Sequence, residues 1–281
     1  MSASPATAPS AASGHTARTS VSYVAVVGLL VTLAVAAGLA CWWFVSEQGH
    51  THGTELSAAA LGQYVLMWSL MMAAMMLPTV HRTTVLYVTA IRRQSASRMW
   101  IGRLAVLLVG YLLVWSVIGI PVYVLGVFVQ RLASTGSLPV VGFTAVLLAA
   151  SGLFQFSALK ERCLHHCQSP LAFVSQYMMR TGWDRDLRAG LAHGLTCLGC
   201  CAAMVIVLIA VGTMSLPAMV VLGAIAMIEK TWVHGPRFSR VMGIGMILYA
   251  AVILMHPAWA PMPFAVPDHS PVIVQSGDHH H

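Results

Sequence analysis

The sequence predicts an all-α, polytopic transmembrane helical bundle of about seven helices, and both its composition and its apolar runs indicate this class. Hydrophobic residues make up 58% of the chain and charged residues only 8%, with a mean hydropathy of +0.79. This composition is typical of integral membrane proteins. The formal charge of +7 does not indicate nucleic-acid binding, because the basic residues lie between apolar runs and not on a polar domain.

The chain is expected to hold one transmembrane domain between two tails. Residues 1–20 are rich in Ala, Ser, Thr and Pro and lack periodicity, which predicts a disordered N-terminal tail. The helical domain is expected over residues 21–256, and the Pro-rich residues 257–281 are expected to be extended. The first apolar run is too long for a signal-peptide core, so we expect it to remain as a membrane helix.

Seven apolar runs are candidates for helices that cross the membrane. The sixth is the weakest candidate, because it is short and carries Pro217 near its start. The runs cover residues 21–45, 56–80, 101–129, 140–159, 187–212, 214–228 and 241–255.

The basic residues predict how this bundle is oriented. With seven spans, every Lys and Arg except Arg131 falls on the same side of the membrane as the N-terminus. By the positive-inside rule, the N-terminus is therefore expected in the cytoplasm and the C-terminus outside. The six cysteines do not lie in segments expected outside, so reduced thiols are a better expectation than a disulfide framework.

The second apolar run contains the densest group of methionines. Met67, Met71 and Met75 are spaced at i, i+4 and i+8, so they form one row along a helix. Methionine sulfur is soft and polarizable, so such a row can line a path for Cu(I). Methionine packing without any metal is an equally good interpretation of the row taken alone.

A Cys-x-His-His-Cys segment follows the fourth run, at the expected cytoplasmic surface. If the segment is helical, Cys163 and Cys167 share a face, with His166 one turn from Cys163 and His165 beside it. Two thiolates and an imidazole can hold Zn(II) or Cu(I). The alternative is a fortuitous group of Cys and His residues.

The fifth run places soft metal ligands on one face of a helix. At about 100° per residue, four of its residues fall within an arc of roughly 60°, which predicts a site for a soft ion such as Cu(I). The alternative is packing, because cysteine and methionine also fill apolar space. Gly190 and Gly194 would then let a neighbouring helix approach closely. The four residues are His193, Cys197, Cys200 and Met204, with Cys201 just beside them.

The sixth run ends in an acidic residue, Glu229, followed by Lys230. A carboxylate at the edge of a membrane helix commonly faces a polar interior or pairs with a cation. Lys230 can instead extend to the headgroups, with Glu229 as its ion-pair partner. Glu229 is therefore both a candidate metal ligand and a candidate structural residue.

Four separate motifs give the chain a family resemblance from about Leu56 to Met255. The chain resembles a bacterial family of predicted metal-binding integral membrane proteins that is described as copper-chaperone-like. The resemblance implies a multi-pass protein of the bacterial inner membrane in which the matching Met, Cys and Glu positions touch a metal. The motifs are Met67-Trp-x-x-Met71-x-x-Ala74-Met75-Met76-x-Pro78, Cys163-Leu-x-x-Cys167-x-Ser169-Pro170 after Gln155 to Lys160, Cys197-Leu-Gly-Cys200-Cys201-x-x-Met204 after Gly190 to Gly194, and Glu229-Lys230.

These observations favour a membrane copper-handling protein without catalytic turnover. It would bind Cu(I), with zinc as the other candidate, for delivery, for assembly of a copper enzyme or for transport. Its expected partners are the lipid bilayer and a copper-dependent membrane enzyme or a metallochaperone. One alternative is an accessory subunit of a larger membrane enzyme complex. Another is a membrane thiol–disulfide oxidoreductase that uses Cys197 and Cys200 as its redox pair.

Overall fold

The all-α class is confirmed by the computed structural model, which describes residues 12–48, 57–94, 99–133, 137–179, 184–211 and 216–259. Helices connected by short turns account for these residues, and no strand occurs among them. The elements are α1 (Ala12–Gln48), α2 (Ala58–Met76), η1 (Pro78–Val80), α3 (His81–Gln94), α4 (Trp100–Ala133), α5 (Ser137–Phe154), α6 (Ala158–Gln168), α7 (Pro170–Met178), α8 (Arg185–Val211), α9 (Leu216–Thr231), α10 (Gly235–Met255) and η2 (Pro257–Trp259).

In the described part of the chain, five helices are long and apolar enough to cross a membrane. A sixth span arises if α5 and α6 count as one, although the chain bends by 61° between them. The weakest expected run forms α9, which has only 16 residues. The expected count of seven spans is therefore not confirmed, and the orientation of the N-terminus stays a prediction. The five helices correspond to Val24–Trp43, Ala58–Met76, Trp100–Val129, Arg185–Val211 and Gly235–Met255.

Several boundaries differ from those expected. Helix α1 begins at Ala12, so residues 12–20 are helical where a disordered tail was expected. Residues 1–11 and 260–281, which hold the rest of the two expected tails, lie outside the described residues. The polar segment after Pro78 forms helix α3, because proline ends α2 and is tolerated at the start of the next helical turn.

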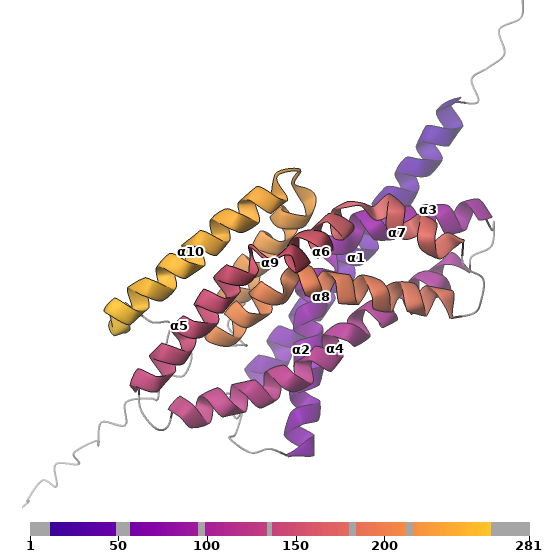
Figure 1. The fold of residues 1–281 in the computed structure, drawn as a ribbon. Coiled ribbons are helices and arrows are strands. Elements are labelled where there is room, and N and C mark those ends of the chain that lie inside the picture. Colours follow the sequence, from indigo (N-terminus) through magenta and orange to yellow (C-terminus); the bar gives the residue numbers. More distant parts are fainter. Residues whose placement is uncertain are drawn as a thin grey trace, which may run out of the picture.

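Helix α8 lies at the centre of the bundle and packs against α4, α5 and α6 (Figure 1). Its contact with α4 is close because glycines face the partner helix. A Cβ at Gly190 would overlap the Leu107 carbonyl oxygen, and one at Gly194 would lie 2.9 Å from Val114. The expectation that these two glycines let a helix approach is therefore confirmed. This packing buries most of α8, including all three of its cysteines.

Candidate metal centre

Three cysteines of α8 bring their sulfur atoms together inside the bundle. The ligand atoms of Cys197, Cys200 and Cys201 all lie within 4.8 Å of one another, and each side chain is at most 1% exposed. Helical spacing explains this grouping, because residues three and four apart share one face and Cys201 follows Cys200 directly. The Cys200 thiol also donates a hydrogen bond to the Cys197 carbonyl oxygen at 3.1 Å. We call these three residues the thiol cluster.

Helix α6 adds two further cysteines beside the thiol cluster. Its first turn is capped by Ser157, whose side chain accepts a hydrogen bond from the backbone of Lys160. From this helix Cys167 places its Sγ 3.7 Å from the Sγ of Cys200. Cys163 lies against Gly199, where an added Cβ would be only 2.6 Å from the Cys163 Sγ. Glycine at position 199 thus allows α6 to approach the cysteine-bearing helix closely.

The side chain of Lys230 enters the same region from α9 and is 5% exposed. Its Nζ lies 3.0 Å from the Cys197 Sγ, 3.1 Å from the Thr79 Oγ1 and 3.8 Å from the Met76 Sδ. Within the described residues, no carboxylate forms a salt bridge with this ammonium. The Tyr111 hydroxyl lies 3.1 Å from the same Cys197 Sγ. Lys230 therefore supplies a positive charge directly beside a potential metal ligand.

The position of Lys230 differs from the interpretation that makes it the ion-pair partner of Glu229. Its side chain is buried inside the bundle and forms no salt bridge with Glu229. Glu229 instead forms a buried ion pair with Lys160, with an Nζ to Oε2 distance of 2.7 Å and side chains 1% and 2% exposed. The second carboxylate oxygen of Glu229 has no hydrogen-bond partner among the described residues. Glu229 is not a member of the thiol cluster, and its role as a metal ligand stays a prediction.

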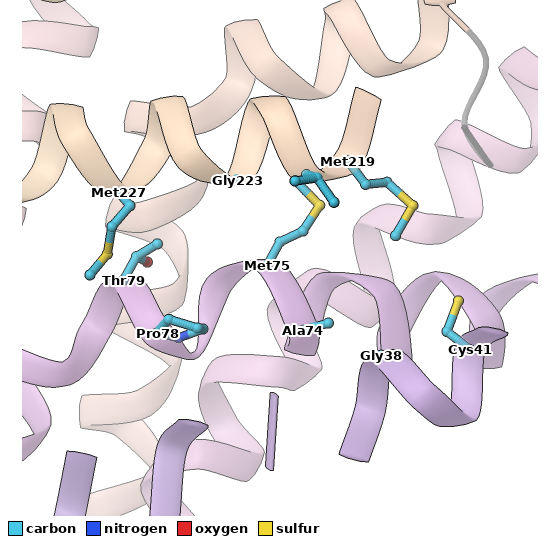
Figure 2. A pocket seen from close by; sticks show the side chains of 10 residues that line it. Gly38, Cys41, Ala74, Met75, Pro78, Thr79, Met219, Gly223 and Met227 are labelled. Carbon is cyan, nitrogen blue, oxygen red and sulfur yellow. The ribbon is translucent and has the colours of Figure 1, made fainter. Parts of the chain in front are cut away.

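The methionines expected to bind metal all lie in or against the hydrophobic core that holds the thiol cluster. Met67, Met71 and Met204 are buried in the same hydrophobic core as the thiol cluster. Met75 is partly buried, packs against this same core and also lines a pocket between α1, α2 and α9 (Figure 2). The methionine that reaches the Lys230 ammonium is Met76, which lies one position beyond the expected row.

The histidines are separated from the thiol cluster. His193 is buried between aromatic rings, with centroid distances of 5.7 Å to Tyr111 and 5.0 Å to Phe173. His166 is exposed, whereas Cys163 and Cys167 of the same segment are partly buried. The Cys-x-His-His-Cys segment thus directs its thiols toward α8 and leaves its imidazoles at the surface. The described residues of the centre therefore bring together thiols, not a mixed set of thiols and imidazoles.

Sequence reasoning did not identify Lys230, Thr79 and Tyr111 as part of this centre. A single signal was available for Lys230, since a lysine that follows an acidic residue in an apolar run needs either a partner or water. No spacing rule links Tyr111 or Thr79 to Cys197, because each lies on a different helical element.

This arrangement can hold a soft metal ion. Thiolates select soft ions such as Cu(I), and the thiol cluster provides two or three of them without help from oxygen ligands. A two-thiolate complex of a monovalent ion carries one negative charge, which the adjacent ammonium can balance. The donor atoms, their burial and the charge beside them thus fit a monovalent soft metal.

Comparison with known proteins identifies a family that matches this chain. A family model described as PpoB2, copper chaperone, matches residues 65–253. The matched segment contains α4, α6, α8 and α9, and so includes the thiol cluster and Lys230. No curated protein and no solved structure gives a match.

Proposed function

The chain belongs to the PpoB2 copper chaperone family, and from this premise we propose that it binds Cu(I) at the thiol cluster and delivers it to a copper-dependent protein. The single observation that carries the proposal is the buried group formed by Cys197, Cys200 and Cys201, with Cys167 3.7 Å from Cys200. Copper is the cargo of this protein, so no catalytic turnover is required. The family description favours delivery over transport.

Copper fits the donor set better than zinc does. Structural zinc sites are almost always tetrahedral and use four ligands. Cys200 and Cys201 are adjacent on one helix, which hinders a tetrahedral arrangement of all four nearby thiols. Cu(I) is bound in lower coordination by soft sulfur ligands, which two or three of these cysteines supply.

We place this activity in the bacterial inner membrane. The apolar helices support a membrane location, and the distribution of basic residues supports a cytoplasmic N-terminus. In this orientation Cys163 and Cys167 lie near the cytoplasmic end of the bundle. The recipient is then a membrane-bound or membrane-associated copper enzyme, or a metallochaperone that docks at this end.

Replacement of Cys197 and Cys200 by serine tests the copper site. Serine has nearly the size of cysteine but is a poor Cu(I) ligand, so the double variant should lose tightly bound copper and keep its helical circular dichroism in detergent. Copper is measured by elemental analysis and by competition with a Cu(I) chelator under anaerobic, reducing conditions. As a matched control, Cys41→Ser changes a buried cysteine of α1 and should leave tight binding intact.

Two results would contradict the proposal. If the purified wild-type protein holds neither copper nor zinc in stoichiometric amount under reducing conditions, the cysteines are packing residues and an accessory-subunit role becomes the better interpretation. If it holds zinc and excludes Cu(I) in competition, the proposed cargo is wrong.

A thiol–disulfide oxidoreductase is the second candidate function, and one observation favours it. The sulfur atoms of Cys167 and Cys200 are 3.7 Å apart, so a small movement would let them form a disulfide. In that case mild oxidation should join Cys167 and Cys200 in the metal-free protein, and a Cys167→Ser variant should lose redox activity while it retains copper. Mass spectrometry of peptides from the oxidised protein distinguishes the two candidates.

A further inference from the structure

The thiol cluster is closed on the sides formed by α2, η1, α4 and α9. The Cys197 Sγ lies 3.1 Å from the Tyr111 hydroxyl of α4 and 3.0 Å from the Lys230 Nζ of α9. On the far side of this ammonium lie Thr79 and Met76, and all four of these neighbouring side chains are buried. An ion that left the cluster in any of these directions would have to displace packed side chains.

The side formed by α6 is different, because it connects the cluster to a polar surface. Helix α6 packs against α8 (Figure 1), and its Cys163 and Cys167 are only partly buried, whereas the three thiols of the cluster are at most 1% exposed. Charged groups are costly among lipid tails, so an exposed face that carries them borders water or lipid headgroups. The exposed residues on this outer face of α6 are Glu161, Arg162, His165 and His166.

The distance between α6 and the cluster suits an exchange of ligands. The Sγ atoms of Cys167 and Cys200 are 3.7 Å apart. A metal–sulfur bond is about 2.3 Å long in zinc sites, so two sulfur ligands of one ion can lie about 4 Å apart. Cys167 lies in the last turn of α6, which ends at Gln168, and a change of its χ1 rotamer moves the sulfur without moving the helix. Cys167 can therefore bind an ion that Cys200 still holds, and Cys163 follows one turn away on the same face.

We propose that Cu(I) enters and leaves the thiol cluster through Cys167, which takes the ion from Cys200 and passes it, with Cys163, to an acceptor at the outer face of α6. The proposal rests on the proposed function and adds the route by which the cargo is transferred. The acceptor must itself supply soft ligands, because oxygen ligands do not compete with thiolates for Cu(I).

Each exchange along this route leaves charge and oxidation state unchanged. A bond between copper and a sulfur atom of the cluster breaks as a bond to the Cys167 sulfur forms. The Cys167 thiol loses its proton, and the thiolate that is released takes one up. Copper remains Cu(I), so the step needs no oxidant or reductant. The route therefore determines how fast copper is exchanged and not how tightly the cluster holds it.

The test measures the rates of copper exchange and the affinity separately. The full-length protein in detergent is loaded with one equivalent of Cu(I) without oxygen and mixed rapidly with an excess of the chelator bathocuproine disulfonate, whose copper complex absorbs visible light. Cys167→Ser should slow both loading and release at least about tenfold, while the equilibrium Kd stays within about twofold of wild type. As a matched control, Cys41→Ser changes a buried cysteine of α1 and should leave both rates unaltered.

A second measurement needs no substitution, so it also serves if Cys167→Ser does not fold. N-Ethylmaleimide, added to the copper-loaded wild-type protein, should alkylate the partly exposed Cys163 and Cys167 before the buried thiols, as mass spectrometry of the peptides would show. The alkylated protein should retain its copper and release it to the chelator at least about tenfold more slowly. Release at the unmodified rate from protein alkylated at Cys167 would overturn the route.

The outcomes separate this proposal from the proposed function. If Cys167→Ser lowers the affinity and speeds release, Cys167 is a permanent ligand of the site and not the residue of exchange. If Cys167→Ser exchanges copper at wild-type rates, the ion uses another path. Both results overturn the route and leave copper binding by the thiol cluster intact. A wild-type protein that binds no Cu(I) tightly would overturn the proposed function, and the route with it.

Discussion

Two buried charges of this protein have contrasting surroundings. The Asp186 carboxylate, at the start of α8, accepts hydrogen bonds from the Tyr87 hydroxyl at 2.5 Å and from the Arg103 Nε and Nη2 at 2.9 and 3.0 Å. The Lys230 ammonium faces a thiol, a hydroxyl and a thioether instead. Asp186 meets an opposite charge, whereas in the described residues Lys230 meets no carboxylate. The first group links helices through an ion pair, whereas under the proposed function the second would balance the negative charge of a metal complex.

The tyrosine in the first group strengthens this contrast. Burial, together with its hydrogen bond to Asp186, raises the pKa of Tyr87 far above its usual value. The hydroxyl therefore stays protonated and donates to the carboxylate throughout the physiological range. Its contribution to stability is lost only in strongly alkaline solution, where the unfolded chain would release the proton first. This network is thus a fixed link between α3, α4 and α8.

Replacement of Asp186 by asparagine should give the largest effect on stability. The change leaves Arg103 without its carboxylate, and breaking such a partly buried pair should lower the free energy of unfolding by about 3 kcal/mol. Copper affinity should not change, because none of these residues touches the thiol cluster. Unfolding in detergent followed by circular dichroism measures the first quantity, and chelator competition measures the second. If Asp186→Asn lost copper and kept its stability, Asp186 would behave as a copper-site residue and the distinction between it and Lys230 would be wrong.

Replacement of Lys230 by methionine should lower copper affinity and leave stability nearly unchanged, the opposite of Asp186→Asn. Methionine has a similar length and no charge, so stability should be unchanged or slightly higher, as is often seen when a buried charge becomes apolar. Cu(I) binding should weaken about 10- to 100-fold, because the negative charge of a two-thiolate complex would lack its counter-ion. Anaerobic chelator competition measures the change. Unaltered affinity would show that Lys230 has a structural role, like Asp186.

The smallest effect on stability is expected at an exposed ion pair at the start of α8. Arg188 pairs with Asp184, and their side chains are 64% and 27% exposed. Arg188→Ala should change the free energy of unfolding by about 0.5 kcal/mol or less, since water screens the pair. The variant is measured beside Asp186→Asn. A loss comparable to that of Asp186→Asn would show that burial does not distinguish the two ion pairs.

The helical class and the grouping of Cys197, Cys200 and Cys201 can be predicted from the sequence alone. Apolar runs predict helices because a membrane-spanning segment must satisfy its own backbone hydrogen bonds. The three thiols share one face because helical periodicity is local and does not depend on the rest of the chain. The Gly190 and Gly194 pair likewise predicts the close approach of a neighbouring helix, which is confirmed, and the structure identifies this helix as α4.

The groups that surround these thiols depend on how the helices pack. Lys230 and Cys197 are 33 positions apart, and their contact depends on how α8 and α9 are rotated and offset relative to each other. The same holds for Cys167, which meets Cys200 because the chain bends by 61° between α5 and α6. Apolar helices can pack at many rotations with similar burial, so periodicity alone does not select the face that Lys230 or Met76 presents. The side chains and glycines that fit at each contact select it, and they come together only in the folded bundle.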